Sequence, residues 1–236
     1  MSSDITLYTY GTPNGHKASV VLEELNIPYK TETVDIMTNA QKEPWFLDIN
    51  PNGRIPALKD GNLRVFETGA IMLYLTDKYD KDYKISYPHG SADYYEMLSW
   101  LMFQMGGVGP MQGQAHHFVA MAKARSDYAI ERYATETKRL YSVLESRLSS
   151  HDWLAGDKYT LADVANFTWV KSSPVILEFD LSEWPGVQKW VERISEREGV
   201  KKGLNVPPST RTPDQTKELF ASMRAKVAAM ENTDKR

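Results

Sequence analysis

The chain opens on alternating apolar and polar residues, and a helical pattern replaces the alternation within fifteen residues. Residues 5–10 are rich in β-branched and aromatic side chains, which predicts a strand. Thr12 then suits the N-cap of a helix, and Pro13 suits its first turn. An amphipathic helix is predicted there because apolar residues recur at helical spacing, namely Ala18, Val21, Leu22 and Leu25.

The pattern continues with three more predicted strands and two more helices up to about residue 79. A second strand is predicted over 29–34 and a short helix over 44–49, followed by the turn-forming residues 50–53. The turn Asp60–Asn62 separates two further strands, and a helix begins at Thr68. The resulting β-α-β-α-β-β-α order predicts a small α/β layer structure of the thioredoxin-like type.

Strand patterns fade after a charged segment that carries Pro88 and Gly90, and helical patterns take over. Glycines and a proline at 106–110 predict a break or kink in the first of these helices. Thr160 and Asp163 predict a capping box, and residues 184–186 introduce a helix that stops near 198. We therefore interpret residues 1–83 as a thioredoxin-like domain, 84–90 as a linker, 91–208 as an all-helical bundle, and 209–236 as a tail, helical or disordered.

Composition narrows the class of protein. The 236 residues are 42% hydrophobic and 25% charged, which is typical of a globular protein with a substantial core. A net charge of −3 without a basic run argues against nucleic acid as a partner. No apolar run is long enough to span a membrane, and the first residues do not resemble a signal peptide, so we expect a cytoplasmic protein. The absence of cysteine excludes disulfides, thiolate metal sites and cysteine nucleophiles.

The segment from Arg54 to Ile71 combines two features that suit a peptide ligand. Pro56 interrupts a strand, and because proline cannot donate to a ladder it belongs at an edge or a special backbone site. The helix that starts at Thr68 adds a terminus that favours a carboxylate. A free strand edge beside an anion site would accommodate a small peptide such as glutathione.

Motifs spread over about residues 4–208 resemble the glutathione transferase family. Ile55–Leu58 and Glu67–Ile71 are similar to the core of its glutathione site. Thr12–Lys17 resembles the nu-class and fungal nitrogen-regulator-like branch, and Thr160–Asp163 resembles the buried helix cap of the second domain. The resemblance implies the two-domain fold described above, with glutathione as co-substrate and its oxidised form as a possible ligand, and no metal.

The resemblance implies that Asn14, and Thr12 with it, hold the sulfur of glutathione at the start of the first helix. A thiol of pKa about 8.5 must fall by roughly 1.5 units to be half ionised at neutral pH, which costs about 2 kcal/mol. One hydrogen bond to a charged group contributes roughly 1.5–3 kcal/mol, and a helix N-terminus about 0.3–1 kcal/mol more. A general base is therefore not required. The alternative is that Asn14 is only a turn residue, and we rank Tyr8 and Tyr10 below it.

The resemblance also implies how the rest of the tripeptide is held. The peptide bond between Ile55 and Pro56 would be cis, so that the backbone of Ile55, which follows Arg54, pairs with the cysteinyl part. Glu67 would bind the α-amino group of the γ-glutamyl part, and Thr68 its carboxylate through the hydroxyl and N–H. Otherwise the proline marks a plain edge strand, Glu67 is an ordinary exposed charge and Thr68 serves only as a helix N-cap.

The remaining candidate residues have a structural interpretation as well as a functional one. Gln41 and Lys42 occupy the loop that would contact the glycyl end, or they form a solvated loop. Arg132 would reach the glutathione site from the helical domain, or it forms an ion pair with Glu131 or Glu136. His116 and His117 are adjacent and so do not face each other on a helix, which makes a metal site improbable.

We expect a glutathione-dependent enzyme that either conjugates an electrophile or reduces a disulfide or peroxide. Without cysteine, disulfide chemistry must run through sulfurs that the ligands bring. The alternatives are a regulatory or interaction protein on the same fold, and an isomerase that acts on a glutathione adduct. A homodimer is expected because the first bundle helix carries apolar side chains all round, at Trp100, Met102, Phe103 and Met105.

Overall fold

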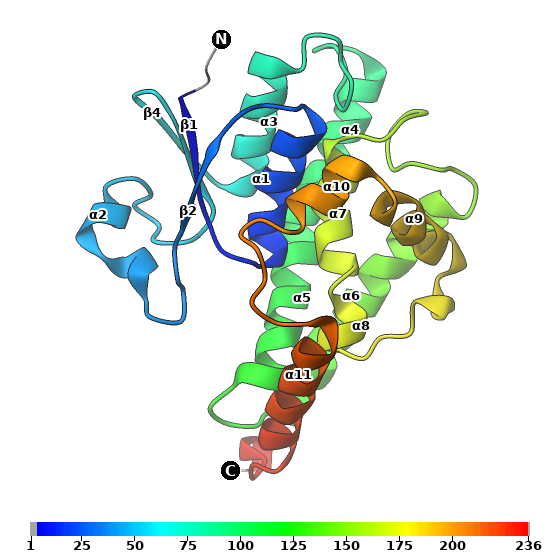
Figure 1. Cartoon of the computed structure of the whole chain (residues 1–236). Helices are drawn as coiled ribbons and strands as arrows, with labels where there is room; N and C mark the ends of the chain where they lie inside the picture. The colour runs from blue at the N-terminus through cyan, green and yellow to red at the C-terminus, as the bar shows by residue number, and fades with distance from the viewer. Residues whose placement is uncertain (1–3, 236) are drawn as a thin grey trace.

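A computed structural model describes residues 4–235 and contains one four-stranded sheet with helices on both sides (Figure 1). The strand order is β2-β1-β3-β4, in which β1 and β2 are parallel and the other pairs are antiparallel. The bounds are β1 Ile5–Thr9, β2 Lys30–Thr33, β3 Ala57–Asp60 and β4 Leu63–Phe66. The predicted thioredoxin-like layer is confirmed.

Two helices, α1 (Pro13–Glu24) and α3 (Thr68–Tyr79), lie between the sheet and the helical half, while the short α2 (Pro44–Leu47) lies on the opposite face (Figure 1). In β1 the side chains of Ile5, Leu7 and Thr9 are buried and those between them are half-buried, as alternation requires. The half-buried Tyr8 packs against Trp45 and Phe46 of α2.

The remaining helices form the second half of the molecule, and α1 packs against two of them, α7 and α10. Their bounds are α4 Ala92–Phe103, α5 Gly109–His116, α6 Asp127–Leu148, α7 Leu161–Val170, α8 Ser173–Ile176, α9 Pro185–Ser195, α10 Glu198–Gly203 and α11 Pro213–Ala228. Among residues 4–235, no helix has both the length and the apolar character needed to cross a bilayer.

Two helix boundaries differ from the predictions. Of the break or kink expected at 106–110, the break does not occur: a π-helical turn, Gln104–Val108, keeps the chain helical from α4 into α5. A π turn accommodates one extra residue without losing the hydrogen-bonded path, which the glycine and proline pattern did not reveal. The helix from Pro185 ends at Ser195, and a separate short helix begins at Glu198. Of the two possibilities for the tail, the helical one is observed as α11.

The centre of the helical half is α7, all ten residues of which are buried. Its predicted capping box is confirmed: the Thr160 hydroxyl accepts from the first turn, and Asp163 accepts from the Thr160 backbone N–H at 2.9 Å. The other carboxylate oxygen of Asp163 accepts from the N–H of Leu154 at 3.0 Å and from the indole of Trp190 at 2.9 Å. The buried carboxylate therefore ties together three segments of the bundle.

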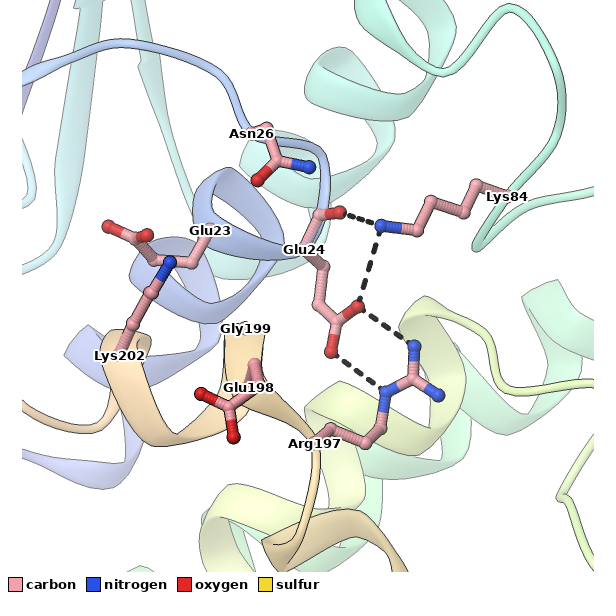
Figure 2. A pocket seen from close by; sticks show the side chains of 8 residues that line it. All are labelled: Glu23, Glu24, Asn26, Lys84, Arg197, Glu198, Gly199 and Lys202. Atoms are coloured by element: carbon pink, nitrogen blue, oxygen red, sulfur yellow. Dashed lines mark hydrogen bonds and ion pairs between the residues drawn. The ribbon is translucent and has the colours of Figure 1, made fainter.

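A charged cluster joins the C-terminal end of α1 to the helical half, beside a cavity of about 380 Å³ (Figure 2). Glu24 is buried and accepts two hydrogen bonds from Arg197, at 2.8 and 2.9 Å. Lys84 also donates to the Glu24 backbone carbonyl. The paired carboxylate therefore joins the two halves at the end of α1 that is far from Thr12.

Candidate active site at the start of helix α1

The register of the sheet places the cis-proline segment beside two helix starts. Tyr8 pairs with Ala57, and Ala57 pairs with Phe66, so Pro56 lies between Thr9 at the end of β1 and Glu67 at the end of β4. The peptide bond between Ile55 and Pro56 is cis, as expected. Since α1 begins after β1 and α3 begins after β4, both helix N-termini face the same edge of the sheet.

The first turn of α1 leaves hydrogen-bond donors for a ligand. Thr12 is the N-cap, and its hydroxyl oxygen accepts from the N–H of Gly15 at 3.1 Å, which leaves the hydroxyl proton free to donate. Pro13 has no N–H, and within residues 4–235 the N–H of Asn14 has no partner. A Cβ at Gly15 would lie 2.1 Å from the carbonyl oxygen of Tyr10, so only glycine allows this close turn from β1 into α1.

The side chain of Asn14 reaches across to the helical half of the molecule. Its Oδ1 accepts a hydrogen bond of 2.9 Å from the indole Nε1 of Trp169 in α7. In the described part of the chain, its Nδ2 has no acceptor. The amide of Asn14 therefore joins Thr12 and the free backbone N–H as a third donor at one helix terminus.

The start of α3 differs from expectation in one respect. The N-cap residue is Glu67 and not Thr68, which is the first helical residue. Glu67 has a φ of 69°, a left-handed conformation that is costly for a residue with a side chain. No side chain caps α3, so its first N–H groups remain available to a carboxylate. The Thr68 hydroxyl instead accepts from Lys17 at 3.2 Å and contacts the sulfur of Met105.

Hydrogen bonds connect the loop residues that precede Pro56 to Glu67, and together they form one rim of the candidate site. Lys42 donates to the backbone carbonyl of Asn52, and the amide of Asn52 donates to Glu67, each at 3.4 Å. Gln41 lies in the same turn and carries a buried Oε1 that has no partner within the described residues. The structure thus brings Gln41, Lys42 and Glu67 to one rim.

The backbone at the proline is open for pairing. Within residues 4–235, neither the N–H nor the carbonyl of Ile55 has a hydrogen-bond partner. Arg54 is exposed, and its backbone carbonyl accepts from the side chain of Asn50 at 2.6 Å. An extended peptide laid beside Ile55 would complete the ladder at this edge.

Sequence reasoning missed Lys17, which is only 1% exposed. Its ammonium donates to the hydroxyl of Thr68 and to the side-chain carbonyl of Gln104 in the π-helical turn. Burial lowers the pKa of Lys17 to about 7, and the nearby carboxylate of Glu67 only partly opposes this. The sequence contained one indication of this burial. Lys17 directly precedes Ala18, the first residue of the apolar face of α1, where a charged side chain is unusual.

Arg132 lines a cavity to which none of the residues above contributes. It is exposed on α6 and lines a cavity of about 520 Å³ between α4, the π turn and α6. The apolar lining includes Met102 and Phe103, and Arg139 pairs with Glu136 in the same cavity. Within one described chain, Arg132 is therefore not grouped with Asn14 and Thr68, and Arg139, not Arg132, binds Glu136.

The two adjacent histidines lie in different environments, as expected for neighbours on a helix. His116 is buried, with its ring stacked on that of Trp169 at a centroid distance of 5.6 Å, whereas His117 is exposed. Burial lowers the pKa of His116 to about 4, so the imidazole is neutral at pH 7. Among the described residues, no three histidine, aspartate or glutamate side chains gather at one point in a way that would hold a metal ion.

Known proteins match the chain along most of its length. Residues 3–77 match the family model "Glutathione S-transferase, N-terminal domain", and residues 108–198 match "Glutathione S-transferase, C-terminal domain". The disulfide-bond oxidoreductase YfcG of Escherichia coli (strain K12) is 42% identical over 207 residues, which cover 85% of this chain and 94% of that protein.

Solved structures agree with these matches. A glutathione transferase homolog from Lodderomyces elongisporus, solved with two glutathione molecules per subunit, has a TM-score of 0.84 and 45% identity, covering 87% of this chain and 99% of that one. The glutathione transferase URE2P8 from Phanerochaete chrysosporium, solved with oxidised glutathione, has a TM-score of 0.81 and 33% identity, covering 94% and 98%. The chain belongs to the glutathione S-transferase family.

Proposed function

We propose that this protein is an enzyme that binds glutathione between the cis-proline edge and the starts of α1 and α3, and uses its thiolate. The observation that carries the proposal is the meeting of an unpaired backbone at Ile55, uncapped N–H groups at the start of α3 and three donors at the start of α1. This set matches an extended peptide with a carboxylate at one end and a sulfur in the middle.

The proposed binding mode combines these groups with the roles that the family resemblance implies. The γ-glutamyl carboxylate would lie on the N–H groups of α3 with the Thr68 hydroxyl, and Glu67 would take the α-amino group. The cysteinyl backbone would pair with Ile55, and the glycyl end would face Gln41, Lys42 and Arg54. The sulfur then lies at Asn14 and Thr12, where the amide, the hydroxyl and the free N–H favour the thiolate.

Two reactions are open to such a thiolate. It can attack an electrophile and form a thioether, or it can attack a disulfide, form a mixed disulfide and release a thiolate. A second glutathione thiolate would then attack the mixed disulfide and release glutathione disulfide and a second thiol. The chain has no cysteine, so every sulfur in this sequence comes from the ligands. Two findings on relatives support the reductive reaction. YfcG is named a disulfide-bond oxidoreductase, and two related structures hold two glutathione molecules or oxidised glutathione.

Turnover measurements with reduced glutathione test the proposal and separate the two reactions. A small disulfide and a hydroperoxide assay reduction, a model electrophile assays conjugation, and binding is measured by calorimetry. We expect glutathione binding and reduction of the disulfide. A protein that binds neither reduced nor oxidised glutathione would instead be a regulatory or interaction protein on this fold.

Glu67→Ala and Thr68→Val should raise the KM for glutathione by about tenfold or more and change kcat less. Both residues would hold a part of the ligand that is remote from the sulfur, so their loss weakens ground state and transition state alike. Glu32→Ala and Thr31→Val on β2 are matched controls, since both side chains are exposed away from the site. Wild-type affinity in both site variants would contradict the assignment.

Binding of S-methylglutathione, which lacks an ionisable thiol, should take up a fraction of a proton at pH 7.5, on the order of one half. The ammonium of Lys17 lies 3.2 Å from the Thr68 hydroxyl and has a pKa of about 7 in the unliganded protein. A carboxylate bound at Thr68 favours the charged form and raises that pKa, so affinity should fall as pH rises above 7. Calorimetry in buffers of different ionisation enthalpy measures the uptake, and Lys17→Met should abolish it; equal uptake in the variant would exclude Lys17 as its source.

We also propose a homodimer that uses the face of α4. Met102 is 47% exposed there, beside the partly apolar cavity that contains Phe103. Light scattering at low micromolar concentration should give twice the chain mass of 26.9 kDa. A mass near that of one chain would refute the dimer.

A further inference from the structure

The hydrogen bond between Asn14 and Trp169 determines which end of the Asn14 amide faces the ligand. An indole N–H can only donate, so its partner must be an acceptor. Of the two ends of a carboxamide only the oxygen accepts, and Oδ1 of Asn14 is indeed 2.9 Å from Nε1 of Trp169. The NH₂ end, which has two protons and no acceptor within residues 4–235, is thereby left for the site.

The orientation matters because the two ends of the amide have opposite effects on a thiolate. An NH₂ group donates to the sulfur anion and stabilises it, whereas a carbonyl oxygen in the same place would repel it. Without a partner on its oxygen, the amide could turn over at little cost. A single donor-only group behind Asn14 is therefore sufficient to select the favourable orientation.

The indole is itself held firmly. Its ring stacks on the buried, neutral His116, with an interplanar angle of 22°, and lies against Gly113, where a Cβ would approach Cη2 to 3.3 Å. The Trp169 carbonyl accepts from the side chain of Gln112 at 2.8 Å. Gln112 in turn accepts from the hydroxyl of Tyr141 at 2.9 Å, so the ring and its backbone are fixed from three sides.

We propose that Trp169 is a positioning residue for the reaction: its indole N–H, presented by the helical half, fixes the Asn14 amide so that the NH₂ end donates to the glutathione sulfur. The inference rests on the proposed function, because it concerns the same sulfur site. It adds that thiolate stabilisation depends on contact between the two halves of the chain, since Asn14 belongs to α1 and Trp169 to α7.

Trp169→Phe tests this because it removes the donor and keeps an aromatic ring between His116 and Gly113. The thiol pKa of bound glutathione, followed by the ultraviolet absorbance of the thiolate, should rise by roughly half to one unit, and kcat/KM below that pKa should fall about three- to tenfold. Affinity for S-methylglutathione should stay close to that of the wild type. Trp184→Phe is the matched control: Trp184 also donates from a largely buried indole, to Ser142 at 3.0 Å, but far from the site.

A double-mutant cycle separates positioning from general damage to the fold. If Trp169 acts through Asn14, then Trp169→Phe should leave the thiol pKa unchanged in an Asn14→Ala background. An equal rise in both backgrounds, or an unchanged pKa in the single variant, would overturn the inference while leaving the proposed function intact. Failure of the wild-type protein to lower the thiol pKa of glutathione would overturn both.

Discussion

Replacing Asn14 with alanine should raise the thiol pKa of bound glutathione and lower turnover by about ten- to a hundredfold. The variant loses one charge-assisted hydrogen bond to the sulfur, worth roughly 1.5–3 kcal/mol. The Thr12 hydroxyl and the backbone N–H at position 14 remain, so residual activity is expected. Affinity for glutathione should change less, because the γ-glutamyl and glycyl contacts are untouched. Ultraviolet titration of the bound thiol measures the effect directly.

A second substitution at the same position sharpens the test. Asn14→Asp keeps an acceptor for the Trp169 indole but replaces the donating NH₂ with a carboxylate beside the sulfur. Its thiol pKa should rise at least as far as in Asn14→Ala, although the contact between the two halves is preserved. Asn205→Ala, an exposed asparagine outside the site, is the control. Thiolate titrations that coincide for both variants and the wild type would show that Asn14 does not hold the sulfur.

The local patterns in the first third of the chain were sufficient to predict the sheet, and the reason is physical. β-branched and aromatic residues located β1, and Thr12 with Pro13 located the start of α1 to the residue. These are short-range signals that depend on neighbours in sequence. The capping box at Thr160 was equally readable, because both of its partners lie within one helical turn.

The features that sequence did not disclose depend on contacts between distant segments. Lys17 is buried only because Thr68 and Gln104, 51 and 87 residues away, surround its ammonium. The partner of Asn14 lies 155 residues away, so no local pattern could reveal it. The π-helical turn also escaped prediction, because glycine and proline at 106–110 read as a helix break until packing against neighbouring helices is known.

The residues of the candidate site show the same difference between local signals and long-range contacts. The positions around Pro56 and Glu67 were predictable because strand, turn and helix signals are contiguous there. Arg132, in contrast, was assigned to the site by resemblance alone, and in a single described chain it lies in the cavity between α4 and α6.

Asp163→Asn should lower the stability of the whole protein by roughly 2–5 kcal/mol, because the amide keeps only one of the two oxygens that together accept from four buried donors. Those donors are the N–H groups of Leu154 and Thr160, the Thr160 hydroxyl and the Trp190 indole, at 2.9–3.1 Å. The isosteric amide turns an NH₂ toward two of them, which leaves donors facing donors. Urea titration should show a lower midpoint, whereas Asp152→Asn, on an exposed side chain, should shift it little. Because Asp163 anchors the start of the helix that carries Trp169, the folded variant should also show a higher thiol pKa for bound glutathione at urea concentrations just below its midpoint. A midpoint equal to that of the wild type would show that this carboxylate does not hold the bundle together.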